Sequence, residues 1–114
     1  MKVVLVAFNG EFMCFIHVLL NALDMNERGY TVKIVLEGAA TGLIPELAKE
    51  GNPMSSLYRK VKQHDLIAGA CKACSAKMGT LEAAEKEGLA LLDEMSGHAG
   101  LARYLEDGFQ VITF

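Results

Sequence analysis

A chain of 114 residues has room for one domain with a single hydrophobic core, so residues 1–114 are expected to fold as one unit. A net charge of −3 provides no general basic surface, which argues against nucleic acid as a partner. No apolar run reaches the roughly 18 to 20 residues that a membrane span needs, and no signal-peptide pattern follows Met1. We therefore expect a cytoplasmic protein that does not enter a membrane.

The predicted elements alternate between strands and helices along the chain. Short β-branched, apolar runs predict five strands, at 2–8, 30–38, 65–70, 89–95 and 109–114, of which 89–95 also fits a helix. Helical spacing of apolar residues, together with turn and capping residues, predicts helices at 11–28, 41–51, 55–64, 80–88 and 96–107. The first strand is apolar throughout instead of alternating, which is typical of a parallel sheet covered on both faces.

This alternation predicts an α/β fold, a three-layer sandwich with helices on both faces of a five-stranded, mostly parallel sheet. If the strand order is flavodoxin-like, 2-1-3-4-5, the order reverses between the first and third strands. Ligands and reactive groups collect beyond the carboxyl ends of strands at such a reversal. The loops at 9–11 and 71–79 follow those two strands, so we expect the site there.

A Cys-x-x-Cys pair, Cys71 and Cys74, lies in the second of these loops, in the stretch "DLIAGACKACSAKMG". Lys72 and Lys77 flank the pair, and nearby cations favour the thiolate, which is the form that attacks sulfur. The pair therefore indicates a reactive cysteine, Cys71, with Cys74 as a second thiol beside it. A bland alternative is that Cys71 is only a small buried strand residue.

Other residues at the same predicted edge are candidates for support. His98, in "SGHAG", follows the fourth strand and could serve as proton donor or thiolate partner. Asn9 and Gly10 follow the first strand and could line the site. The "FNGEF" segment lacks the glycine spacing and the lysine of a phosphate loop, so no cofactor is predicted.

A metal site is the alternative interpretation of the cysteines. Cys14 and His17 fall near the start of the first predicted helix, at the same edge of the sheet. Together with Cys71 and Cys74 they would make a four-ligand set of the kind that zinc accepts. A packed cysteine and a hydrogen-bonded histidine are the more common outcome on an apolar helix, so no metal is expected.

Composition also suggests an oligomer. The chain is 52% hydrophobic, and a domain this small cannot bury so much apolar surface by itself. We expect the surplus on the Met13 and Phe15 side of the first helix, on the "GLIPEL" helix and on the terminal "VITF" strand.

With strands and cysteines placed, the chain resembles the DsrE/DsrF-like family of small sulfur-relay and related proteins. The resemblance runs from the "VVLVAF" opening through "YTVKIVLEGAATGL" and the cysteine loop to "SGHAGLARYLEDGFQVITF". It implies a flavodoxin-like sandwich that assembles into homodimers, trimers or hexamers. It also implies that Cys71 accepts sulfur as a persulfide and passes it on between donor and acceptor proteins. A simple carrier of this kind uses one cysteine, so the second cysteine, Cys74, is a departure from that pattern.

Three functions therefore compete. The first is sulfur transfer, as a persulfide carrier or sulfurtransferase, in which Cys71 holds the sulfur, Cys74 resolves it, and the lysines stabilise the anions. The second is a zinc-binding module that uses the cysteine loop. The third is a dithiol redox module. A thioredoxin site normally has a cis-proline opposite its cysteines, whereas Pro45 and Pro53 are not expected opposite this loop.

Overall fold

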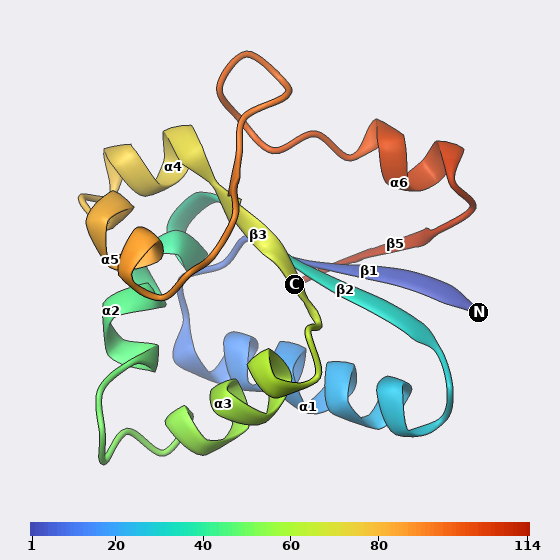
Figure 1. Ribbon diagram of the computed structural model, residues 1–114, viewed down its shortest axis with the longest axis horizontal. Coiled ribbons are helices and arrows are strands. Elements are labelled where there is room, and N and C mark those ends of the chain that lie inside the picture. Colours follow the sequence, from blue (N-terminus) through green and yellow to red (C-terminus); the bar gives the residue numbers. More distant parts are fainter.

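A computed structural model describes residues 1–114 and consists of a five-stranded parallel sheet with helices on both faces (Figure 1). The strands are β1 (Lys2–Ala7), β2 (Thr31–Leu36), β3 (Ile67–Cys71), β4 (Leu91–Leu92) and β5 (Gln110–Thr113). The helices are α1 (Phe12–Glu27), α2 (Ile44–Leu47), α3 (Ser55–Gln63), α4 (Lys72–Lys77), α5 (Leu81–Lys86) and α6 (Ala102–Glu106), with a 3₁₀ helix η1 (Gly38–Leu43). The predicted α/β class and parallel sheet are confirmed.

The two faces of the sheet carry cores of different size. Alternate β1 residues, such as Val3 and Leu5, face a cluster of 20 buried residues to which α1 and α3 contribute. The intervening residues, such as Val4 and Val6, face a cluster of only seven, which includes Cys71 and Tyr104 of α6. β1 is buried on both faces, which explains why its sequence is apolar without alternation.

The strand order is β4-β3-β2-β1-β5, which corrects the predicted order 2-1-3-4-5. Right-handed crossovers place successive helices on one face as long as strands are added in one direction. The steps β1 to β2 to β3 run in one direction, and α1 and α3 accordingly share a face. The chain then reverses to place β5 beside β1, which puts α6 on the opposite face (Figure 1).

This order changes the surroundings expected for the cysteine loop. β3 pairs with β2 and β4, so it does not lie beside β1, and the reversal of strand order lies between β1 and β5. The segment that follows β2, beginning at Glu37, is therefore closer in the sheet to the cysteine loop than the segment that follows β1.

The fourth strand and the last helix are both shorter than predicted. β4 contains only Leu91 and Leu92, and α6 begins at Ala102 instead of near Ser96. Ser96 and Gly97 have φ values of 52° and 90°, which a helix start cannot accommodate. They are the central residues of a tight turn in which Met95 and His98 exchange backbone hydrogen bonds of 2.9 Å.

The apolar surplus lies only partly where it was expected. Met13 is 75% exposed and Ile112 of β5 is 38% exposed, as predicted, but Phe15 and the Ile44 and Leu47 side chains of α2 are buried. The other large exposed apolar side chains are Met1, Phe8, Phe12, Leu20, Met78, Met95 and Leu105. None of the helices combines the length and the apolar composition that crossing a bilayer requires.

Candidate functional site

The site is built at the carboxyl end of β3, where the chain passes directly into α4. Cys71 is the last residue of β3 and the N-cap of α4, and its side chain is fully buried. Its sulfur accepts a hydrogen bond from the backbone N–H of Cys74 at 3.4 Å, and its carbonyl accepts one from the Ser75 hydroxyl at 2.8 Å. The Cys-x-x-Cys spacing thus forms the first turn of a helix, with both cysteines on one side of it.

Gly69 allows the next strand to approach β3 closely. A Cβ atom at this position would lie 2.5 Å from the Ala90 carbonyl oxygen, so no larger residue fits without a shift. The Ala70 N–H donates to that same carbonyl at 2.8 Å. The segment after β4 is therefore delivered to the edge of the sheet where Cys71 lies.

A tight hairpin over residues 93–98 then carries His98 to the cysteines. Positive φ at both Ser96 and Gly97 is the requirement of a type I′ turn. The Gly97 carbonyl accepts a 2.9 Å hydrogen bond from the N–H of Ala73 in α4. This bond ties the hairpin to the cysteine helix and fixes the position of His98.

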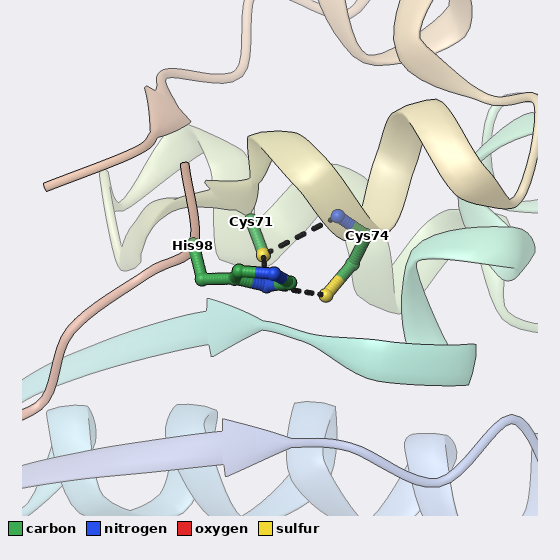
Figure 2. A group of neighbouring side chains, drawn as sticks. All are labelled: Cys71, Cys74 and His98. Carbon is green, nitrogen blue, oxygen red and sulfur yellow. Dashed lines mark hydrogen bonds between the residues drawn. The ribbon is translucent and has the colours of Figure 1, made fainter. Parts of the chain in front are cut away.

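Figure 2 shows both sulfur atoms pointing toward the His98 ring. His98 Nδ1 lies 3.4 Å from Cys71 Sγ and 3.6 Å from Cys74 Sγ, and the three side chains approach one another to within 4.8 Å. Their exposure increases from buried Cys71 through half-buried Cys74 to exposed His98. The cluster therefore opens to solvent on the histidine side, and Cys71 is its innermost member.

Burial raises the pKa of the Cys74 thiol, and the interaction with Cys71 raises it further. Hydrogen bonding from the backbone of Gly38 opposes this increase, while Coulomb interactions with Cys71 and Glu37 add to it. Cys74 is therefore held as the neutral thiol. A thiol can donate a hydrogen bond to its neighbour, whereas a thiolate can only accept one.

Glu37 is a site residue that the sequence analysis missed. It is the first residue after β2, it is buried, and burial raises the pKa of its carboxyl group. The positive charge of His98 opposes this increase and the negative charge of Glu94 reinforces it. A charged residue directly after an apolar strand, in "VLEG", was the available signal.

The predicted supporting lysines do not surround the thiols. Lys72 is half exposed and lies 3.9 Å from Asp93, so its charge is directed toward that carboxylate. Lys77 is exposed in the last turn of α4, at the far end of that helix from Cys71. The groups that reach the Cys71 sulfur are instead the Cys74 backbone N–H, which donates to it, and His98 Nδ1 at 3.4 Å.

Asn9 and Gly10 lie beside the start of η1, and neither is hydrogen-bonded to the cysteines. The Asn9 side chain accepts a 2.8 Å hydrogen bond from the Glu11 N–H and so organises the turn before α1. Gly10 is packed so closely on Ala39 that a Cβ would lie 3.0 Å from the Ala39 Cβ. Their roles in the structure are local.

The structure does not bring Cys14 and His17 to the cysteine loop, which corrects the predicted four-ligand set. Both residues line a hollow beside Phe114 at the β5 edge, and His17 Nδ1 contacts the Met13 carbonyl at 2.8 Å. Strand β3 lies two strands further from that edge than β1 does. His98 takes the place beside Cys71 and Cys74 that these two residues have in the alternative four-ligand set.

Comparison with protein-family models identifies the family of this chain. The model of the DsrE/DsrF-like family matches residues 3–114, nearly the whole chain, and the chain belongs to this family. Family membership supports a sulfur-relay role in general terms.

Two archaeal relatives are described only as uncharacterized. A protein of Methanocaldococcus jannaschii is 36% identical over 96 residues, which cover 84% of this chain and 76% of that protein. A protein of Archaeoglobus fulgidus is 40% identical over 58 residues, which cover 51% of this chain and 93% of the relative. No solved structure gives a significant match.

Proposed function

We propose that this protein is a sulfur carrier that accepts sulfane sulfur on Cys71 as a persulfide and passes it to a partner protein. The observation that carries the proposal is the convergence of two thiols and one imidazole nitrogen within 4.8 Å. The family to which the chain belongs gives the class of chemistry, and the geometry suggests a role for each residue.

Cys71 is the better candidate for the thiolate. Its sulfur accepts the Cys74 N–H at 3.4 Å and lies 3.4 Å from His98 Nδ1, which donates to it in the tautomer or charge state that carries a proton on that nitrogen. An imidazolium at His98 would add a positive charge beside the same sulfur. Because Cys74 is held as a thiol, it contributes an S–H group instead of a competing charge.

The transfer balances without an added oxidant. The Cys71 thiolate attacks the outer sulfur of a donor persulfide, R–S–SH. A bond forms between Cys71 Sγ and that sulfur, and the S–S bond of the donor breaks, so the donor thiolate leaves with the electron pair. The product is a Cys71 persulfide, and an acceptor thiolate removes its outer sulfur in the same way.

Cys74 provides a second outcome. Deprotonated Cys74 can attack Cys71 Sγ and expel the outer sulfur as hydrosulfide, which leaves a Cys71–Cys74 disulfide. Two thiols are oxidised and the sulfane sulfur is reduced, so the electrons balance. His98 can accept the Cys74 proton, since its Nδ1 lies 3.6 Å from that sulfur.

Intact-mass analysis of reduced, metal-free protein treated with polysulfide tests the proposal. Wild type and Cys14→Ser should each gain one sulfur atom, Cys71→Ser should gain none, and Cys74→Ser should retain its persulfide longest. Cys14→Ser is the matched control because Cys14 lies outside the cluster. Labelling of Cys71→Ser equal to that of the wild type would contradict the assignment.

A further inference from the structure

The distances from the His98 nitrogen to the two sulfurs also suit a metal ion. A tetrahedral zinc ion has Zn–S bonds of about 2.3 Å and Zn–N bonds of about 2.0 to 2.1 Å, which places sulfur and nitrogen ligands about 3.5 Å apart. The His98 Nδ1 atom lies 3.4 Å and 3.6 Å from the two sulfurs. Both distances agree with that value.

From this agreement we propose that Cys71, Cys74 and His98 form a three-ligand site for a thiophilic divalent cation of the zinc type, with the fourth coordination position open. In the bound form both cysteines would be thiolates and the imidazole neutral, so the complex with a divalent ion would carry no net charge. Sulfur and imidazole ligands select zinc over magnesium or calcium, which prefer oxygen.

The ligands come from segments that are already fixed to each other. Cys71 and Cys74 are locked in the first turn of α4, and the hairpin that carries His98 is tied to Ala73 by a 2.9 Å backbone hydrogen bond. Such a site needs little rearrangement to close around an ion. The exposed His98 side of the cluster provides the entry path that a metal site requires.

An open fourth position distinguishes this site from a purely structural one. Structural zinc sites are closed by four protein ligands, whereas sites with three protein ligands hold water or a substrate in the fourth position. No fourth cysteine, histidine or carboxylate belongs to the cluster. The vacant position would take water or the thiolate of an incoming sulfur compound.

Titration of reduced, metal-free protein with Co²⁺ and then Zn²⁺ tests the site directly. We expect one Co²⁺ per chain, thiolate-to-cobalt charge-transfer absorption from two sulfurs, and visible bands of tetrahedral coordination that Zn²⁺ abolishes. Cys74→Ser should halve the charge-transfer absorption. Losing a residue that only hydrogen-bonds to a metal ligand weakens metal affinity by about 10- to 100-fold. His98→Ala removes a ligand itself, so it should weaken the affinity for both ions by more than that.

Two control variants distinguish this site from the four-ligand alternative that the sequence offered. Cys14→Ser and His17→Ala should bind both ions as the wild type does. Because Cys71 is buried and its replacement could unfold the chain, the partly exposed Cys74 and exposed His98 carry the test. Wild-type affinity in His98→Ala, absence of the two-thiolate spectrum, or loss of binding in His17→Ala would each overturn the proposal.

This test is independent of the sulfur-carrier proposal. A chain that binds zinc with these three ligands but gains no sulfur from polysulfide would retain the metal site and lose the carrier function. A chain that forms the Cys71 persulfide but shows no tetrahedral cobalt spectrum would retain the carrier function and lose the metal site. If both hold, zinc should block persulfide formation, because the ion occupies the Cys71 sulfur.

Discussion

The N–H of Ala73 donates a 2.9 Å hydrogen bond to the carbonyl of Gly97, and this bond joins the two segments that make the site. Ala73 lies between the two cysteines, and Gly97 immediately precedes His98. The backbone therefore sets the distance between thiols and imidazole before any side-chain interaction forms.

The hairpin turn gives the first prediction. Gly97→Ala should lower the free energy of unfolding by about 1 kcal/mol, because a residue with a Cβ is strained at its φ of 90°. A shift of the hairpin to relieve that strain should also move the imidazole signals of His98 in NMR spectra and slow persulfide formation.

Gly88→Ala is the matched control for this variant. Gly88 has a φ of 72° and no neighbouring atom within 4 Å of an added Cβ, so the substitution adds the same kind of strain away from the site. Chemical denaturation should show a similar decrease in the free energy of unfolding for both variants. Unchanged His98 signals in Gly97→Ala would show that the turn does not position the histidine.

The second prediction concerns the order in which the cysteines react. A bulky maleimide should modify Cys74 well before Cys71, because Cys74 is partly exposed and Cys71 is fully buried. Peptide mass mapping after timed alkylation measures each cysteine separately. The same chain unfolded in urea is the control, in which both cysteines should react at similar rates. Faster reaction of Cys71 in the folded chain would contradict the buried position described above.

The third prediction follows from Glu37. Burial raises the pKa of this carboxyl group, so the folded state resists its ionisation more than the unfolded state does. The wild type should therefore lose stability as pH rises from the ordinary glutamate value, about 4.3, through the raised folded pKa. Glu37→Gln should be more stable than wild type at neutral pH, by on the order of 1 kcal/mol, and equal to it in acid.

Thermal unfolding of both proteins between acidic and neutral pH measures this difference. Glu11→Gln, at an exposed position before α1, is the comparison and should follow the wild-type pH profile. A Glu37→Gln difference that is constant over the whole pH range would show that ionisation of Glu37 is not its cause.

The fourth prediction is self-association. Light scattering at micromolar concentration should give a mass at least twice the 12.3 kDa of one chain. Phe12, Met13, Ile16 and Met54 line one apolar hollow, and Met13 is 75% exposed. Met13→Lys should therefore shift the chain toward monomer, because it places a charge in that apolar surface. Leu105→Lys on α6 is the control. A wild-type mass of a single chain would contradict the prediction.

The sequence predicted the five strands of the sheet because β-branched runs and the turns beside them are local features. It also placed the Cys-x-x-Cys pair correctly at the end of β3. The strand order could not be predicted in the same way, since both orders contain the same elements in the same succession. The direction in which β3 is added depends on how α1 and α3 pack together, and that contact joins distant segments.

The candidate site shows the same division between local and long-range information. Cys71 and Cys74 form their hydrogen bond through one helical turn, whereas His98 reaches them from 27 and 24 residues away. The "SG" dipeptide at Ser96 and Gly97 is a turn signal, but it was interpreted as a helix start. Glu37 was missed because its proximity to the site depends on the pairing of β2 with β3.

The unequal cores on the two faces of the sheet have a consequence for access to Cys71. The α6 face is held to the sheet by a cluster of seven buried residues, whereas the opposite face is held by a cluster of 20. In native proteins, segments with few buried apolar contacts open at lower free energy than the rest of the fold. Local opening of the α6 layer, with α1, α3 and the sheet intact, would uncover the innermost thiol without unfolding the protein. The face that is weaker for stability is thus the face on which a partner's sulfur could enter.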